Sequence, residues 1–372
     1  MGIMALNRLD LFNARIIAYT LAASLLAHPV MSKEALRVPA FNDIATFDPD
    51  NGFEIGAMSA INNVYEGLVE YAPGTVTIIG RLAKEWRISD DGKEYEFDLV
   101  KGVKFHDGTE MTARDVSASF LRRRDSGLAL SYFFANVEKI EAIDDLTLKI
   151  VLKHAQPSFL DSLASPWGPK VISPTALAQH DQTDNATGWL NEHADGTGPY
   201  TLEEFNRGDG YVLKKNNAYW GRKPYFDEIQ IPIVPDISQQ MLQLRTGDID
   251  VVPTGYPFAQ LRGLPEGLSV SSSASVSLYT LFAKPGSPLD DPEIREAILT
   301  AVNPASWAAD AFGEYASAAK SVYPVVVLDP KNRSSFRRTS IAPRISSRVA
   351  ALSAWSLVST VLHRATSGSQ AC

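Results

Sequence analysis

The residue types that most often carry catalysis are sparse in this chain of 372 residues, and they are not spaced as a reactive site requires. The six histidines form no His-x-x-x-His or His-Glu-x-x-His pattern, and the single cysteine is Cys372 at the extreme end. Because zinc is held by histidine and thiolate ligands at such spacings, we expect no metal site and no cofactor. A Gly-x-Ser-x-Gly nucleophile elbow is also absent from the sequence.

His106 and Asp107 are neighbours and suggest a catalytic dyad, but Gly108 follows them, and a turn pair beside glycine is the simpler interpretation. The acidic pairs at 203–204 and 290–291 have the character of solvated surface or helix caps. An exported hydrolase stays open as an alternative, although no residue is singled out as its nucleophile or base. We expect a binding protein and not an enzyme.

The segment Gly196-Thr197-Gly198-Pro199-Tyr200 is rich in glycine, as phosphate-binding loops are. However, no Lys-Ser or Lys-Thr follows it and no strand–helix–strand unit frames it, so phosphate binding is not indicated. The Gly-Pro pair predicts a turn that leads into a strand.

The clearest series of structural signals runs from Trp86 to Phe120. Trp86–Ser89 and Glu94–Leu99 flank a polar cluster whose Asp-Gly favours a tight reversal, since Gly92 tolerates positive φ. Apolar and acidic residues alternate along Glu94–Leu99, which predicts a strand with one buried face. Together these signals predict an antiparallel hairpin.

Other patterns along the chain predict a capped helix and a second hairpin. Thr112 stands three residues before Asp115, the spacing of a helix N-cap with a capping-box partner. Val137–Ile143 and Thr147–Leu152 alternate around an Asp-Asp turn and predict the second hairpin.

Two later helices are also predicted. Ser238 is the expected N-cap of the first, and Gly247 ends it before the strand Asp248–Val252. The second begins at Pro292 after two aspartates, and its apolar residues repeat at helical spacing as far as Val302.

Read as text, several of these segments resemble one family, the peptide/nickel class of extracellular solute-binding proteins (family 5) that feed ABC importers. The matching segments extend over about residues 36–330, and they are LAKEW at 82–86, SDDGK at 89–93, KGVKFHDG at 101–108, TARDV at 112–116, YEGL at 65–68, GTGPY at 196–200 and NNAYW at 216–220. Val100 departs from the family pattern, which has a basic residue there.

The N-terminus has the pattern of an export signal. Arg8 and Arg15 precede an apolar run from Ile16 to Ala27 that is too short to span a bilayer, and we expect cleavage after Ser32. A buried N-terminal helix is the alternative. No cysteine follows the apolar run, so we expect a free periplasmic protein without a lipid anchor.

Charge is unevenly distributed along the chain. The net charge is −8, and the tail from Lys331 to Cys372 has one lysine and six arginines but no acidic residue, so residues 1–330 carry −15. An acidic body argues against nucleic acid as a partner.

The resemblance stops near Pro330, and family members run much longer. We interpret the basic tail, which holds ten serines, as out-of-frame translation, with a genuine short variant as the competing interpretation. The apolar residues in Val349–Leu362 predict a short helix there.

The resemblance implies a mixed α/β (α+β) fold like that of type II periplasmic binding proteins, with two lobes, an inserted subdomain and an incomplete second lobe. The expected division is a signal peptide at 1–32, lobe I at 33–65 and 170–255, the inserted subdomain at 66–169, the start of lobe II at 256–330 and the atypical tail at 331–372.

The resemblance also implies a function and a site. We expect the substrate-binding component of an ABC transporter, a peptide importer, that acts as a monomer and delivers its ligand to inner-membrane permease subunits with their cytoplasmic ATPases. The resemblance places Thr254, Gly255, Tyr256 and Tyr279 at the ligand cleft, and it ranks Ile55–Met58 lower. A binding protein for nickel or another small solute, and a truncated remnant without function, are the alternatives.

Overall fold

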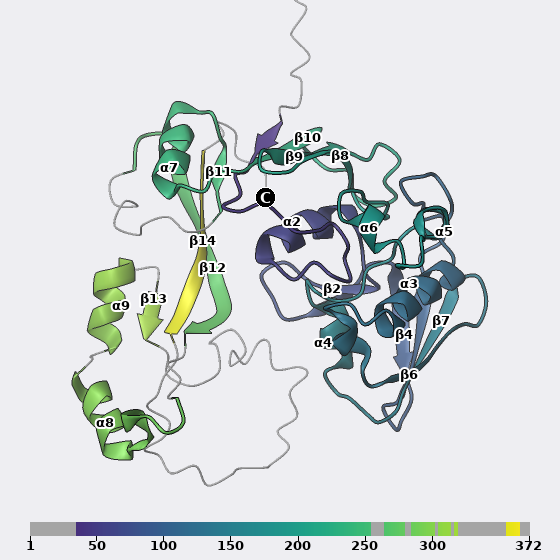
Figure 1. Cartoon of the computed structure of the whole chain (residues 1–372), viewed down its shortest axis with the longest axis horizontal. Coiled ribbons are helices and arrows are strands. Elements are labelled where there is room, and N and C mark those ends of the chain that lie inside the picture. Colours follow the sequence, from purple (N-terminus) through teal and green to yellow (C-terminus); the bar gives the residue numbers. More distant parts are fainter. Residues whose placement is uncertain are drawn as a thin grey trace, which may run out of the picture.

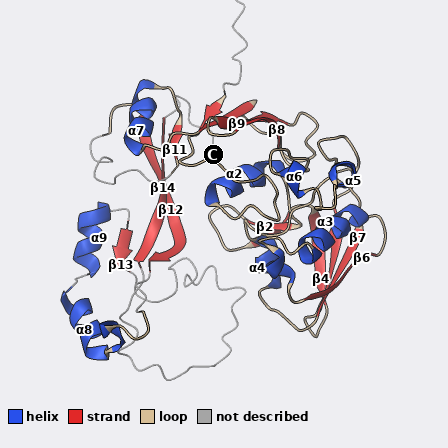
Figure 2. Ribbon diagram, viewed as in Figure 1, coloured by secondary structure: helices blue, strands red, loops and turns tan. Residues whose placement is uncertain are grey.

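The computed structural model describes residues 35–253, 264–279, 284–301, 304–313, 316–318 and 355–364. The predicted signal segment therefore lies outside the described residues. Figure 1 shows a larger body formed by the chain up to β10 and a smaller body that holds α7, α8, α9, β12, β13 and β14. Both bodies mix helices with strands (Figure 2). No helix within the described ranges is long and apolar enough to cross a membrane.

The first sheet of the larger body joins Leu36–Arg37 to strands about 165 to 195 positions later in the chain. Its order is β1-β10-β9-β8, with β1 parallel to β10 and the other neighbours antiparallel. The strands are β1 (Leu36–Arg37), β8 (Tyr200–Asn206), β9 (Gly210–Lys215) and β10 (Glu228–Pro232). Helix α2 (Ile55–Val64) buries one face against the same core, which gathers side chains from 44–65 and 172–213.

The second sheet of the larger body is built from the two predicted hairpins. Its order is β4-β5-β7-β6, all antiparallel, and the strands are β4 (Ala83–Ile88), β5 (Glu94–Leu99), β6 (Val137–Ala142) and β7 (Thr147–Leu152). Gly92 has φ 70° at the first turn, as the Asp-Gly signal predicts. Both hairpin predictions are confirmed.

Helix α3 (Ala113–Asp125) packs on this second sheet, and its start agrees with the predicted capping box. The Asp115 carboxylate accepts hydrogen bonds from the backbone N–H of Thr112 at 2.7 Å and from its hydroxyl at 2.8 Å. The remaining elements of the larger body are β2 (Val69–Tyr71), β3 (Ile78–Gly80), the 3-10 helix η1 (Ser131–Phe134), α4 (Phe159–Ala164), α5 (Pro174–His180) and α6 (Thr187–Leu190).

The smaller body has a sheet of order β11-β14-β12, in which β13 also pairs with β14. Its elements are α7 (Ile237–Thr246), β11 (Val251–Val252), β12 (Leu268–Tyr279), the 3-10 helix η3 (Pro288–Asp290), α8 (Pro292–Ala301), α9 (Pro304–Phe312), β13 (Ala316–Ala318) and β14 (Trp355–Arg364). Helix α7 ends at Gly247 as predicted, but its N-cap is Asp236 and not Ser238, because the Asp236 carboxylate accepts the N–H of Gln239 at 2.8 Å.

The helix predicted within Val349–Leu362 is wrong. Residues Trp355–Arg364 form strand β14, which lies antiparallel to β12 and pairs Val270 with Leu362 and Ser271 with Val361. Valine and threonine side chains branch at Cβ and favour a pleated strand over a helix. Pairing with a long neighbouring strand therefore outweighs the helical spacing of the apolar residues.

The predicted division into lobes stays a prediction, and the buried clusters are the observations that bear on it. One cluster gathers residues between Leu68 and Val171. A separate cluster joins Met241, Leu244, Ile249 and Val252 of α7 and β11 to Leu264, Leu268 and Val270. Residues 237–252 thus pack with the chain that follows them.

Two segments that resemble the family in sequence, KGVKFHDG at 101–108 and GTGPY at 196–200, contact each other in the fold. The N–H of Gly196 donates to His106 Nδ1 at 3.3 Å, so His106 Nε2 carries the proton and donates to the Gly198 carbonyl at 3.0 Å. Burial lowers the pKa of His106, which agrees with a neutral ring. Asp107 accepts instead from the Ser173 hydroxyl at 2.6 Å. His106 and Asp107 thus bond to different partners, His106 to the segment 196–198 and Asp107 to Ser173, and they do not act on each other as a dyad would.

Gly198 packs so closely against the end of α2 that it has no room for a side chain. A Cβ there would lie 2.6 Å from the carbonyl oxygens of Asn63 and Val64. We expect Gly198→Ala to lower the free energy of unfolding by about 1–3 kcal/mol, as overpacking of backbone does. Urea unfolding followed by circular dichroism measures this.

Gly56→Ala is the matched control, since a Cβ at Gly56 meets only Ile44 Cγ2, at 3.9 Å. It should leave the midpoint unchanged or slightly higher because alanine favours helix. Equal losses in the two variants would contradict the steric explanation.

Candidate functional site

The structure describes only part of the site predicted from the sequence. Thr254, Gly255 and Tyr256 lie outside the described residues. Tyr279 is the last residue of β12 and pairs with Trp355 of β14. Val252, at the end of β11, pairs with Leu362 on the same strand. These two positions on β14 are therefore seven residues apart, about 23 Å along an extended strand.

The lower-ranked segment Ile55–Met58 begins α2, and the structure divides it into two parts. Ala57 and Met58 are buried in the core of the first sheet, while Ile55 is 76% exposed and Gly56 is also exposed. In Figure 1, α2 lies at the edge of the larger body that is turned toward β12 and β14. The first turn of α2 is therefore available to a ligand, as is Ser59, which is also exposed.

Exposed or half-buried apolar side chains from the first turn of α2, the loop before it and two other segments form what we call the apolar rim. Phe53 and Tyr132 are each 60% exposed, far more than large aromatic side chains usually are. The full set comprises Phe53, Ile55, Tyr132, Phe133 and Trp167. The rings of Phe53 and Trp167 lie 6.3 Å apart, and those of Tyr132 and Phe133 lie 4.8 Å apart.

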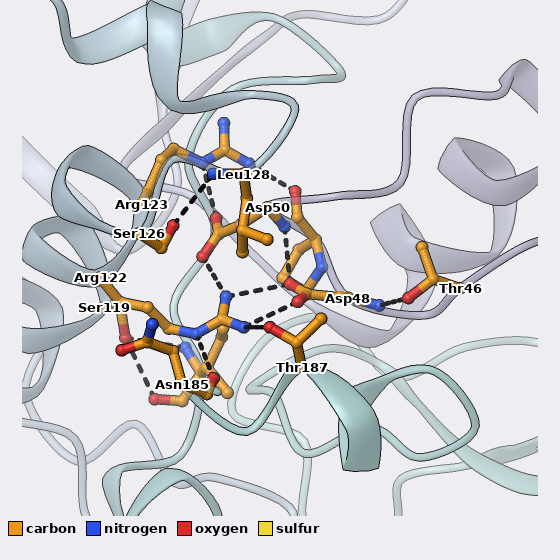
Figure 3. Close-up of polar contacts among 12 residues, drawn as sticks. Thr46, Asp48, Asp50, Ser119, Arg122, Arg123, Ser126, Leu128, Asn185 and Thr187 are labelled. Carbon is orange, nitrogen blue, oxygen red and sulfur yellow. Dashed lines mark hydrogen bonds and ion pairs between the residues drawn. The ribbon is translucent and has the colours of Figure 1, made fainter. Parts of the chain in front are cut away.

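The rim comes from three chain segments, and a buried ion cluster of Asp48, Asp50, Arg122 and Arg123 holds them together. These four residues are at most 8% exposed. Figure 3 shows both arginines reaching from α3 toward the two aspartates. Arg122 makes a two-pronged contact with Asp48, Nη1 to Oδ1 at 3.0 Å and Nη2 to Oδ2 at 2.7 Å, and it also bonds Asp50.

Arg123 connects the cluster to the rim. Its Nε donates to Asp50 Oδ1 at 2.6 Å, and its two other nitrogens donate to the carbonyls of Pro49 and Trp167. The Trp167 indole N–H in turn donates to the Phe53 carbonyl at 2.9 Å. The Arg123 guanidinium also lies 5.9 Å from the centre of the Phe133 ring. A single side chain thereby orders all three segments.

The backbone of Asp50 adds a further link, because its carbonyl accepts the N–H of Leu130 at 3.1 Å, just before η1. On the opposite side, the Asn185 carbonyl accepts from Arg122 Nε at 2.8 Å. Asn185 and Ala186 both have left-handed φ, 57° and 60°, which is strained for a residue with a Cβ. This conformation directs the Asn185 carbonyl at the guanidinium.

The electrostatics of the cluster explain why buried charges are tolerated there. Burial alone would lower the pKa of Arg122, but the hydrogen bond to Asp48 and the charges of Asp50 and Asp48 raise it above its ordinary value. Two carboxylates face two guanidinium groups, so the cluster is neutral. Such a group is costly to assemble and costlier to break, since loss of one partner leaves an unpaired buried charge.

Of the rim and the cluster, only Ile55 is among the residues predicted from the sequence, as part of the lower-ranked segment Ile55–Met58. Arg122 and Asp48 are separated by 74 positions, and nothing in local patterning joins them. One signal of the cluster was present in the sequence. Arg122 and Arg123 are adjacent within the predicted helix and directly follow its apolar residues Phe120 and Leu121. Charges placed there need buried partners.

Removing one charge from the cluster should cost far more than removing one from the surface. We expect Asp50→Asn to lower the free energy of unfolding by about 3–5 kcal/mol, because both arginines lose a buried partner. Asp98→Asn is the control, since Asp98 pairs with the exposed Arg87 on β4 and should change little. Urea unfolding measures both. A loss in Asp50→Asn no larger than in the control would contradict the role given to the cluster.

Comparisons with known proteins agree with this architecture. The chain is 32% identical over 307 residues to the probable D,D-dipeptide-binding periplasmic protein DdpA of Escherichia coli, covering 80% of this chain and 58% of that protein. It is 31% identical over 312 residues to the glutathione-binding protein GsiB of Salmonella paratyphi A, covering 82% of this chain and 59% of that protein.

A similar solved structure is that of the periplasmic binding protein DppA from Helicobacter pylori in complex with the peptide STSA. The TM-score is 0.69 at 27% sequence identity, and the match covers 78% of this chain and 60% of that one. The chain thus spans about three fifths of the length of these relatives.

The model of the bacterial extracellular solute-binding proteins, family 5 (middle region), matches residues 77–338. This match includes β4 to β7, α3 with its two cluster arginines, and the Gly196–Tyr200 turn, whereas the two cluster aspartates and α2 precede it. The chain belongs to the bacterial extracellular solute-binding proteins of family 5, a family of binding proteins and not of enzymes.

Proposed function

We propose that this protein is the substrate-binding component of an ABC importer, acting in the periplasm as a monomer, and that its solute is a peptide. The apolar rim forms one wall of the binding site. Inner-membrane permease subunits, driven by cytoplasmic ATPases, receive the solute. The observation that carries the proposal is the exposed rim held in place by a buried ion cluster.

The rim has the chemistry that a peptide site needs. Aromatic and aliphatic surfaces accept many side chains, since they exclude water without requiring a particular partner. Phe53, Ile55 and Tyr132 each expose most of their apolar surface, which a bound ligand would cover. Because the cluster fixes the three segments beforehand, little entropy is lost when a ligand settles on them.

The three relatives described above support a peptide as the solute. Their names and titles give a D,D-dipeptide, glutathione and the peptide STSA as what they bind. Glutathione is itself a tripeptide, so all three ligands are short chains of amino acids joined by amide bonds. The shared chemistry is that of short peptides.

The second wall of the proposed site lies on the smaller body. We assign to it Thr254, Gly255 and Tyr256, which follow β11, and Tyr279 at the end of β12. The ends of β11 and β12 lie about 23 Å apart along β14. A tripeptide reaches less than half of that distance, so a short peptide would contact one of the two ends and not both.

Loss of rim side chains should weaken binding without weakening the fold. We expect Phe53→Ala and Tyr132→Ala each to reduce affinity for a mixed tripeptide library about tenfold, since buried aromatic anchors carry most binding energy. Because both side chains are largely exposed, the melting temperature without ligand should stay the same. Thermal unfolding of the full chain with and without the library measures both quantities.

Ile143→Ala is the control, because Ile143 is 54% exposed just beyond β6, away from the rim. It should bind as the unaltered protein does. The proposal fails if the library gives no upward shift of the melting temperature, or if the rim variants and the control shift equally.

A further inference from the structure

Lys170 is a buried cation that the structure leaves without a partner. It follows Trp167 of the rim by three residues and is 9% exposed. Within the described parts of the chain, its ammonium group makes no hydrogen bond and no ion pair. The nitrogen is not among the fully enclosed polar atoms, so the end of a buried stem reaches solvent.

The backbone around Lys170 is fixed on both sides. The Trp167 carbonyl accepts from Arg123 at 2.7 Å, and the Val171 N–H donates to the Glu66 carbonyl at 3.0 Å. Segment 167–171 therefore runs from the ion cluster to the strand that starts at Val69. The ammonium has little freedom to search for a partner elsewhere.

The nearest acidic groups are already engaged. The Glu66 carboxylate accepts from the Thr197 hydroxyl at 2.8 Å, the Tyr219 hydroxyl at 2.7 Å and the Trp220 indole at 2.8 Å, and it pairs with Arg81 at 2.6 Å. Glu70 lies 3.5 Å from Arg81. Neither carboxylate comes within 4.0 Å of Lys170.

Burial, and next the charge of Arg123, lower the pKa of Lys170 to about 8, while Glu70 and Glu66 act in the opposite direction. Protonation at neutral pH therefore costs free energy that an incoming anion would return. A lysine in an apolar setting without a counter-ion is uncommon, because buried charges are normally paired.

We propose that Lys170 binds a carboxylate of the captured solute, so that the ligand is an acid and not merely apolar. The inference rests on the proposed function, since it assumes that the rim beside Lys170 is the ligand wall. The inference adds that one group of the ligand is a carboxylate and that Lys170 binds it. Either the C-terminus of a peptide or an acidic side chain supplies the same chemistry.

Three tripeptide libraries separate the possibilities, tested on the full chain by thermal unfolding and calorimetry. The first has free C-termini and no acidic side chains, the second is the same library amidated, and the third is amidated with one glutamate per peptide. We expect at least about tenfold tighter binding of the first library than of the second. Tight binding of the third would identify an acidic side chain as the source.

Variants at Lys170 test the residue itself. Lys170→Met should abolish the preference for acids, and Lys170→Arg should retain it, because guanidinium also binds carboxylate. Lys170→Met should melt no lower than the unaltered protein, since it removes an unpaired buried charge. Lys139→Met, at an exposed lysine on β6, is the control and should keep the preference.

A pH series provides an independent reading. Lys170 loses its proton through about pH 8, so the affinity of the unaltered protein for free acids should fall between pH 7 and pH 9 relative to that of Lys170→Arg. The peptide amine titrates equally in both, so it cancels in this ratio.

The outcomes are distinguishable. If no library binds, the proposed function fails. If the free and amidated libraries bind equally, or if Lys170→Met keeps the preference for acids, the site still binds peptides but the inference about Lys170 is overturned.

Discussion

Two buried carboxylates facing two buried guanidinium groups are the constraint on which the rest of the larger body depends. Asp48 and Asp50 belong to the loop before α2, whereas Arg122 and Arg123 belong to α3. Since none of the four charges is solvated, the loop and the helix must come together accurately or not at all. The pairing fixes the loop to the helix, and the hydrogen bond from Arg123 to the Trp167 carbonyl adds the segment around residue 167.

The cluster consists of charged side chains, but the side chains that it holds in position are apolar. It keeps Phe53 and Tyr132 exposed on a wall whose backbone is held by side-chain hydrogen bonds. A rigid wall of this kind suits a binding protein, because binding energy is not spent on ordering it. Lys170 follows Trp167 of this wall by three residues, and in our proposal a carboxylate of the ligand forms the ion pair that the described part of the chain does not supply.

Local structure could be predicted from the sequence, and long-range pairing could not. The Gly92 turn, the Asp115 capping box and the hairpin strands each depend on residues that are close together in sequence, so the sequence pattern predicts them. The cluster joins residues more than 70 positions apart, and strand β14 owes its state to β12, which precedes it by about 80 residues. The N-cap of α7 lies two positions before the predicted one for a local reason, since Asp236 is as good an N-cap as serine and accepts the Gln239 N–H.

Hydrogen exchange measured by mass spectrometry on the full chain, with and without the peptide library, tests most directly whether the rim is the ligand wall. The account predicts slower exchange on binding in residues 53–58, 131–135 and 167–171, with no change in the hairpin of β4 and β5. Protection confined to that hairpin, or found nowhere despite binding, would contradict it.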